Sequence, residues 1–215
     1  MKIGILGSGV VGQALGKGFA ALGHDVKIGT RKPEDDKLKL WIRETAGKGS
    51  VASPGEAVKF GEIAVLATAW SGTEHAIQLA DPKHLAGKVV IDVTNPLQPT
   101  PNGPPTLGVG FTDSAGEQVQ RLLPQSKVVK AFNTVGNAHM FKPQFPGGPP
   151  DMFIAGNDAG AKDKVSDIVK AFGWGVIDIG GIEGARYLEP LGMMWIAYGF
   201  KTHGWNHAFK LLRKP

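Results

Sequence analysis

Three glycines near the amino terminus are spaced to hold a phosphate group. They lie in a GxGxxG pattern, in which the first glycine allows a tight turn, the second lets backbone N–H groups approach a pyrophosphate, and the third lets a helix pack close to a strand. The pattern follows a short apolar run, opens a helical pattern and belongs to a βαβ unit of about 30 residues. We therefore predict a dinucleotide-binding loop formed by Gly7, Ser8, Gly9, Val10, Val11 and Gly12.

A basic cluster follows the second expected strand, where many NAD-binding proteins carry an acid. About 20 residues past the glycines, such an acid binds the adenosine ribose and repels a 2′-phosphate. This chain has Thr30, Arg31 and Lys32 there. A guanidinium can form a bidentate pair with a phosphate and stack on adenine, and a threonine adds a hydroxyl donor. The cluster therefore favours NADP(H). The alternative is that Arg31 and Lys32 only face water ahead of the acidic run Glu34-Asp35-Asp36.

Both features belong to an alternation of short apolar runs and helical patterns, which is typical of βαβ units on a parallel sheet. Ser53, Pro54 and Glu56 form the signature of a helix start, with an N-cap, a first-turn proline and a capping-box acid. The loop from Asn95 to Thr112 is rich in proline and glycine and long enough to be functional. We expect strands at 2–6, 24–29, 62–68, 88–94, 127–133, 151–156 and 174–180, and helices at 10–23, 36–45, 53–60, 114–123 and 159–172.

The chain changes character after residue 180. From Glu183 onward the pattern is helical and rich in large apolar residues. We therefore predict an α/β fold, a doubly wound parallel sheet of the NAD(P)-binding Rossmann type with a short C-terminal helical appendage. Residues 1–180 would form the nucleotide-binding body. Residues 181–215 would form a helical segment that completes a second pocket or a dimer interface.

Composition excludes several kinds of site. The 215 residues contain no cysteine, which rules out disulfides, thiol nucleophiles and thiolate metal sites and fits a reducing compartment. No apolar run reaches about 18 residues, and Met1-Lys2 leads straight into a short apolar strand, so we expect no membrane span, no export and a cytoplasmic protein. The net charge of +5 is spread over scattered lysines, so we expect no nucleic-acid partner.

Longer stretches resemble a known family. The segment KIGILGSGVVGQALGKGFAALGHDVKIGTRKP, the later VVKAFNT and the C-terminal LEPL are similar to the NADP oxidoreductases that depend on coenzyme F420, a deazaflavin. The same stretches resemble the reductase domains of the STEAP ferric reductases, which pass the hydride of NADPH to a flavin. The resemblance runs over nearly the whole chain. It implies an oxidoreductase that exchanges a hydride directly between NADP(H) and coenzyme F420 or a flavin such as FMN or FAD.

The resemblance also gives roles to residues at the ends of the expected strands. It implies that residues 7–11 hold the pyrophosphate, that residues 30–32 hold the 2′-phosphate, and that Ala67, Thr68, Ala69 and Trp70 border the ribose and adenine. Ligands bind at the carboxyl ends of parallel strands near the topological switch point. The residues after two further strands would therefore reach the nicotinamide and its partner ring: Asn95, Pro96, Asn133, Thr134 and Val135. Asn95 before a proline also fits a simple turn.

Hydride transfer between two rings needs the reacting carbons about 3 to 3.5 Å apart and little help from a protein acid or base. We therefore name no catalytic proton donor. Met193 and Met194, with Trp195, could form the floor of the acceptor pocket. At helical spacing with Ile196 and Tyr198, such residues are more often core or dimer contacts. We expect a small-molecule redox partner and a homodimer.

The chain departs from the family pattern at two places. Asn133 stands where members that use F420 tend to have a histidine. The acidic run at 34–36 replaces a more basic continuation, so Lys32 or Lys37 would have to support Arg31. Two other functions stay open: a reductase of a small imine or carbonyl, similar to the pyrroline-5-carboxylate reductases, and a non-catalytic NADP-sensing domain. The tail is short for the all-helical second domain that those reductases usually carry.

Histidines offer no clear metal site. His203 and His207 have the i, i+4 spacing of a metal pair, but neither a third ligand nor a nearby acid follows, so we expect no metal there. His139 lies in the loop after Asn133, where contact with a substrate is an open alternative.

Overall fold

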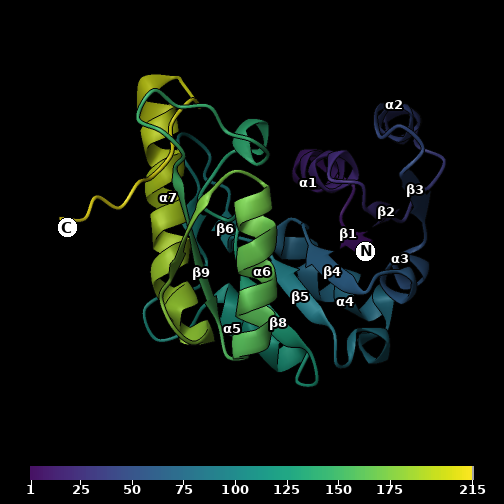
Figure 1. Cartoon of the computed structure of the whole chain (residues 1–215). Coiled ribbons are helices and arrows are strands. Elements are labelled where there is room, and N and C mark those ends of the chain that lie inside the picture. Colours follow the sequence, from purple (N-terminus) through teal and green to yellow (C-terminus); the bar gives the residue numbers. More distant parts are fainter. Residues whose placement is uncertain (215) are drawn as a thin grey trace.

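The computed structural model describes residues 1–214, and an eight-stranded sheet forms its centre (Figure 1). The strand order across the sheet is β10-β9-β8-β5-β4-β1-β2-β3. These strands are β1 (Lys2–Leu6), β2 (Asp25–Gly29), β3 (Gly49–Ala52), β4 (Ile63–Leu66), β5 (Val89–Asp92), β8 (Lys127–Lys130), β9 (Asp151–Gly156) and β10 (Gly175–Asp178). A separate antiparallel hairpin joins β6 (Leu97–Gln98) to β7 (Thr106–Leu107).

Helices connect the strands and cover both faces of the sheet. They are α1 (Val10–Ala21), α2 (Asp36–Glu44), α3 (Pro54–Phe60), α4 (Thr73–Ala80), α5 (Ala115–Leu122), α6 (Ala159–Ala171) and α7 (Ala185–Thr202), with short 3₁₀ turns η1 (Trp70–Gly72), η2 (Pro82–Leu85), η3 (Asn137–His139) and η4 (Ile182–Gly184). This arrangement confirms the predicted α/β fold with its Rossmann-type sheet.

The side chains of each central strand enter two separate layers of core. Along β4, Ile63 and Val65 belong to a cluster that includes apolar residues of α1 and α6, whereas Ala64 and Leu66 belong to a cluster that includes residues of α4 and α5. Successive side chains of a strand point to opposite faces of the sheet. A short strand that is apolar at every position therefore indicates cover on both faces, as the doubly wound fold provides.

The sheet has its switch point between β1 and β4. The chain runs outward through β1, β2 and β3, and then returns so that β4 pairs in parallel with the other side of β1. In the main sheet, the neighbouring strands β3, β2, β1, β4, β5 and β8 all pair in parallel. The strand β9 runs antiparallel to β8, with Lys130 opposite Ala155. The predicted parallel sheet is therefore confirmed except for this one pairing. A parallel crossover usually contains a helix, and residues 131–150 between β8 and β9 contain only the short turn η3.

Local signals in the sequence were mostly reliable. Every strand that we expected is present, and α3 begins with the predicted capping box, in which the Ser53 hydroxyl accepts from the Glu56 N–H and the Glu56 carboxylate accepts from the Ser53 N–H. The strand β3 was not expected, because its sequence, Gly-Ser-Val-Ala, has no continuous apolar run. It forms at the edge of the sheet by pairing with β2.

The tail is helical only in its first part. Figure 1 shows α7, in yellow, at the opposite end of the molecule from α2 and α3. The helix ends at His203, which has a left-handed φ of 50°. The following segment packs along α7 and β9, and the Asp151 N–H donates to the Phe209 carbonyl at 2.9 Å. The predicted helical segment over residues 181–215 is therefore helical only as far as Thr202, and residues 203–214 pack without a helix. No helix within residues 1–214 is both long and apolar enough to span a membrane.

Candidate cofactor and acceptor site

The glycine loop closes tightly around its first and third glycines. Gly7 has a φ of 118°, and a Cβ on it would lie 2.3 Å from the Ala67 carbonyl oxygen. A Cβ on Gly12 would lie 2.0 Å from the Gly7 carbonyl oxygen, whereas a Cβ on Gly9 would meet no atom within 4 Å. Residues 7 and 12 must therefore be glycine for the loop to pack. Gly9 leaves open space beside the backbone, where a pyrophosphate can approach.

The amino terminus of α1 presents backbone donors to that space. Gly9 is the N-cap and offers no side-chain acceptor, and the first turn of the helix contains no acidic residue. The first intrahelical bond runs from the Gln13 N–H to the Gly9 carbonyl at 3.0 Å. The N–H groups ahead of Gln13 have no partner inside the helix, and the helix dipole adds partial positive charge at this end. The local chemistry therefore suits an anion such as a pyrophosphate.

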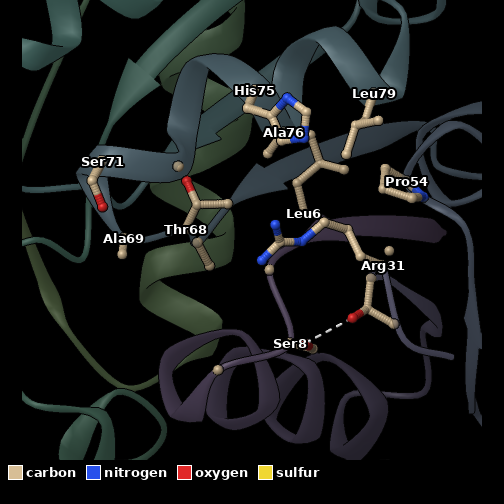
Figure 2. A pocket seen from close by; sticks show the side chains of 16 residues that line it. Leu6, Ser8, Arg31, Pro54, Thr68, Ala69, Ser71, His75, Ala76 and Leu79 are labelled. Atoms are coloured by element: carbon tan, nitrogen blue, oxygen red, sulfur yellow. Dashed lines mark hydrogen bonds between the residues drawn. The ribbon is translucent and has the colours of Figure 1, made fainter. Parts of the chain in front are cut away.

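Thr30 joins the glycine loop to the basic cluster. Its N–H donates to the Ala52 carbonyl at 3.0 Å, which fixes the end of β2 against β3. Its hydroxyl accepts from the Ser8 hydroxyl at 3.0 Å, the dashed line at Ser8 in Figure 2, and from the Lys32 N–H at 3.3 Å. This network holds the backbone on either side of Arg31 in a fixed relation to the phosphate loop.

A cavity of about 350 Å³ lies at the carboxyl ends of β1 to β4, beside the glycine loop. In Figure 2 the Arg31 guanidinium points into the space between the glycine loop and α4. The cavity is therefore basic on one side and open to the helix amino terminus on the other. It brings together many of the residues that the sequence predicted: Gly7, Ser8, Gly9, Thr30, Arg31, Ala67, Thr68 and Ala69.

Two helices add cavity walls that the sequence reasoning missed. Pro54 begins α3, and His75, Ala76 and Leu79 lie on α4 (Figure 2). The apolar members suit a flat base such as adenine, and His75 adds a polar group on the side opposite the glycine loop. One sequence signal existed, the capping pattern that places Pro54 at the start of α3, whereas β3 and α4 were not expected.

Other predicted cofactor residues lie outside the cavity wall. Val10 is 66% exposed on the first turn of α1, Val11 packs against the core, and Lys32 is exposed. Gly12 is buried beneath the loop. Trp70 packs against the core layer that includes residues of α4 and α5. These residues therefore support the loop or flank the cavity rather than line it.

A second meeting of strand ends lies outside this cavity. The Asn95 side-chain amide donates to the Asn133 carbonyl at 2.7 Å, and the Asn133 amide donates to Asn95 Oδ1 at 3.0 Å. Asn133 Nδ2 also donates to the Leu188 carbonyl of α7 at 2.9 Å. The Asn133 side chain is buried, and its Oδ1 has no hydrogen-bond partner within residues 1–214. The two predicted asparagines thus form one unit with α7, although they are distant in sequence.

The remaining residues predicted for the acceptor pocket differ in exposure. Thr134 and Val135 are buried, and the Thr134 hydroxyl lies 3.9 Å from the Met152 sulfur. Pro96 is also buried, Met193 is partly buried, and Met194 is 55% exposed.

A strained backbone position precedes the asparagine unit. Phe132 has a left-handed φ of 60°, ends the extended run of β8, and donates its N–H to the Met152 sulfur at 3.1 Å. Such a conformation is unfavourable for a bulky residue and is often found at functional sites. It turns the chain at the point where Asn133 begins, a feature that residue types alone do not reveal.

The acidic run after the basic cluster has a structural role. Asp35 is the N-cap of α2 and accepts from the Lys37 N–H at 3.0 Å. Asp36 lies in the first turn, where negative charge favours the helix dipole, and pairs with Lys39 at 2.7 Å. The acids that follow Arg31 are therefore explained by the start of α2.

The histidines of the second half of the chain serve packing. His139 contacts Asn206 through Nε2 at 3.0 Å and lies outside the cavity wall. His203 is the C-cap of α7, and the His207 ring stacks on Trp195 with ring centroids 4.5 Å apart. Among residues 1–214, no cluster of three or more His, Cys, Asp or Glu side chains is arranged to hold a metal ion.

The family model for NADP oxidoreductases dependent on coenzyme F420 matches residues 2–96 of this chain. The F420-dependent NADP reductase of Methanocaldococcus jannaschii is 30% identical over 211 residues, which covers 94% of this chain and 93% of that protein. The chain belongs to this family. It is therefore an NADP-dependent oxidoreductase.

A second group of relatives shares the same region. Rat metalloreductase STEAP3 is 30% identical over 194 residues, which covers 88% of this chain. The chain spans only 36% of the length of STEAP3. The likeness to STEAP3 therefore concerns one part of a longer protein.

Solved structures agree with this assignment. A crystal structure of an Arthrobacter sp. FB24 protein, described as a candidate F420-dependent NADP-reductase, has a TM-score of 0.93 and 38% identity and covers 99% of this chain and 100% of that one. An Aspergillus terreus imine reductase bound to NADPH4 has a TM-score of 0.66 at 16% identity, over 94% of this chain and 63% of that one. The second likeness shows a shared fold alone.

Proposed function

We propose that this protein transfers a hydride directly between NADP(H) and coenzyme F420. The observation that carries the proposal is the cavity in which Arg31 faces the space beside a glycine loop and the amino terminus of α1. This combination provides separate positions for a pyrophosphate and for a second phosphate. NADP(H) carries both groups, whereas NAD(H) carries only the first.

The donor would be held by residues that the fold already fixes. The backbone of the glycine loop and the first turn of α1 would bind the pyrophosphate. Arg31 and the Thr30 hydroxyl would bind the 2′-phosphate, and the apolar walls from Pro54, Ala76 and Leu79 would contact the adenine. When bound, NADPH supplies the hydride from C4 of its nicotinamide ring. The chain's own contribution is binding, orientation and exclusion of water.

The acceptor would lie near the asparagine unit formed by Asn95 and Asn133. Both residues follow strands at the same edge of the sheet as the cavity, which is where ligands bind in open α/β sheets. The unpaired Oδ1 of Asn133 supports this placement, because a buried acceptor without a donor costs about 1 to 3 kcal/mol and an N–H group of a ligand would relieve that cost. A direct transfer needs no protein acid or base, so Asn133 would orient a ring rather than donate a proton.

Coenzyme F420 is the preferred acceptor because the relatives named as F420-dependent NADP reductases align with this chain over nearly their whole length. A flavin is the alternative acceptor within the same proposal, since its ring system has the same flat shape and also accepts a hydride. Asn133 in place of the histidine of many F420-using members keeps this alternative in the test.

We also propose that the protein is a homodimer. Tyr187, Met194 and Tyr198 lie on one side of α7 at helical spacing and are 74%, 55% and 56% exposed. A stripe of large exposed apolar side chains is typical of an interface, and a second copy of α7 would cover it. A cytoplasmic location is proposed on the lack of cysteine, which suits a reducing compartment.

The test is a matrix of donors and acceptors followed by absorbance. NADPH and NADH would each be offered with F420, FMN, FAD and a small cyclic imine. The proposal expects turnover with NADPH and F420, and slower or no turnover with the imine. Tight NADPH binding without turnover of any acceptor would instead support an NADP-sensing domain, and turnover of the imine alone would support the small-substrate alternative.

A further inference from the structure

One lysine and two carboxylates are completely buried between the sheet and α7. Lys130 Nζ lies 2.8 Å from Asp92 Oδ2 and 2.9 Å from Glu189 Oε1. The side chains of Lys130 and Asp92 are 0% exposed, and that of Glu189 is 1% exposed. Lys130 ends β8, Asp92 ends β5 and Glu189 lies on α7. The cluster therefore joins two parallel strands to the C-terminal helix through charged groups in the interior.

Each charged group has further partners. Asp92 Oδ1 accepts from the N–H and the hydroxyl of Thr94, at 2.9 and 2.7 Å, and Lys130 also donates to the Thr94 carbonyl at 2.7 Å. The Glu189 carboxylate accepts from the N–H groups of Ala115 and Gly116, at 2.9 and 3.0 Å. These N–H groups open α5, whose amino-terminal dipole offsets the second negative charge. The cluster is therefore a fully connected network, the form in which buried charges are tolerated.

The charge of the lysine is maintained by its neighbours. Burial opposes the charged form, but the carboxylates of Asp92 and Glu189 outweigh burial and raise the pKa of Lys130 above its usual value. Lys130 is therefore positively charged at neutral pH. A buried ion network is seldom more stable than apolar residues of the same size. Such a network can instead fix one geometry, because a shift of α7 would leave buried charged groups without partners.

The three segments that carry the charged cluster, β5, β8 and α7, also contact each other three residues further along each segment. Asp92 precedes Asn95 by three residues, Lys130 precedes Asn133 by three, and Glu189 precedes Gly192 by three. Gly192 packs directly against the asparagine unit. A Cβ on Gly192 would lie 2.8 Å from the Asn133 carbonyl oxygen and 3.0 Å from Asn95 Oδ1. The charged cluster and the asparagine unit are therefore successive layers of one contact between β5, β8 and α7.

We propose that Lys130, Asp92 and Glu189 are positioning residues that hold α7 against the ends of β5 and β8 and thereby set the geometry of the acceptor end of the site. The inference rests on the proposed function, because it places the acceptor beside the asparagine unit. No residue of α7 lines the cavity that holds Arg31. Disturbing the cluster should therefore impair use of the acceptor and leave NADPH binding intact.

The first variant is Glu189→Gln. Glutamine keeps the size of the side chain, but it has only one acceptor oxygen for two backbone N–H groups and places an NH₂ group where donors already converge. The second variant is Gly192→Ala, which leaves every charge in place and moves α7 away from the asparagine unit through the added Cβ. Two chemically different changes thus disturb the same contact.

The matched control is Lys88→Met. Lys88 is a lysine of the sheet that is only partly buried, and its Nζ donates to the backbone carbonyls of Val58 and Gly61 at the end of α3. Its loss should lower the melting temperature without moving α7. The control therefore separates a general loss of stability from a change at the acceptor end.

The experiment measures the NADPH dissociation constant, the acceptor kcat and KM, and hydrogen exchange of peptides from 185–202 in each full-length variant. For Glu189→Gln and Gly192→Ala we expect kcat/KM for the acceptor to fall about 10- to 100-fold, as for a misplacement near 1 Å. The NADPH dissociation constant should stay within about twofold of the parent value, since distant sites are nearly independent. Exchange in 185–202 should be faster, and Lys88→Met should show none of these changes.

The outcomes are distinct for the two ideas. If the parent protein reduces neither F420 nor a flavin, the proposed function fails, while hydrogen exchange and NADPH binding still report on the cluster. If the parent turns over and both variants keep kcat/KM and slow exchange in 185–202, the positioning role is refuted. An equal loss of NADPH binding and of acceptor use would also refute the positioning role, because the cluster would then stabilise the fold in general and have no specific effect on the acceptor end.

Discussion

Arg31→Ser tests whether the basic cluster selects the donor. Of the two cationic side chains in the basic cluster, Arg31 lines the cavity and Lys32 lies outside it. A hydrogen bond to a charged group contributes about 1.5 to 3 kcal/mol. Because Arg31 is exposed, solvent weakens its interaction with the 2′-phosphate, and we count the contribution of one such bond. At 1.4 kcal/mol per factor of ten, removal of the guanidinium should weaken NADPH binding about 10- to 100-fold.

The measurement is a fluorescence titration with NADPH and with NADH at two ionic strengths. NADH lacks the 2′-phosphate, so its dissociation constant should change by no more than about twofold. Lys32→Ser is the matched control, because it removes the neighbouring charge without touching the cavity, and should weaken NADPH binding only slightly. If Arg31→Ser weakened NADPH and NADH by the same factor, Arg31 would not contact the 2′-phosphate.

Three further changes test other parts of the structure. Gly12→Ala should abolish binding of both nucleotides or prevent folding, since its Cβ would lie 2.0 Å from the Gly7 carbonyl oxygen; normal NADPH affinity would contradict the loop geometry. Ser53→Ala should lower the free energy of unfolding by about 1 kcal/mol through loss of the helix cap, as urea denaturation would show, and an unchanged midpoint would mean that the cap is dispensable. The hydrogen bonds from Arg186 and the burial that partly opposes them leave the pKa of Glu117 below its usual value of 4.5. A depressed carboxyl pKa stabilises the fold above pH 4.5 and loses that effect as pH falls below it. As pH is lowered from 7 to 3, the melting temperature of Glu117→Gln should therefore fall less steeply than that of the parent protein. Identical slopes for the two proteins would refute the contribution of Glu117.

The donor end of the site could be predicted because its chemistry is local in sequence. The glycine loop and Arg31 lie within one βαβ unit, and each residue type has a direct physical reason there. His75 and Leu79 were missed because they reach the cavity from the helices that follow the strands, and residue type alone does not tell which turn of a helix faces a ligand.

The acceptor end depends on contacts between distant segments, which sequence patterns do not specify. The pairing of Asn95 with Asn133 and the hydrogen bond from Asn133 to Leu188 of α7 join three parts of the chain. The strand ends were expected to meet, but the buried charge of Lys130 behind them was hidden within an apolar strand. The tail misled for a related reason. Trp205 and His207 give an apolar, helix-like pattern, yet both pack against Trp195.

Direct hydride transfer is tested most directly with a deuterium label. NADPH carrying deuterium at one face of C4 would be incubated with F420 in ordinary water, and the reduced deazaflavin would be analysed by mass spectrometry and NMR. The account predicts that, for one of the two C4 labels, the deuterium is found on the reduced ring. If the reduced ring carried no deuterium with either label, so that its new hydrogen came from solvent, direct transfer between the two bound rings would be contradicted.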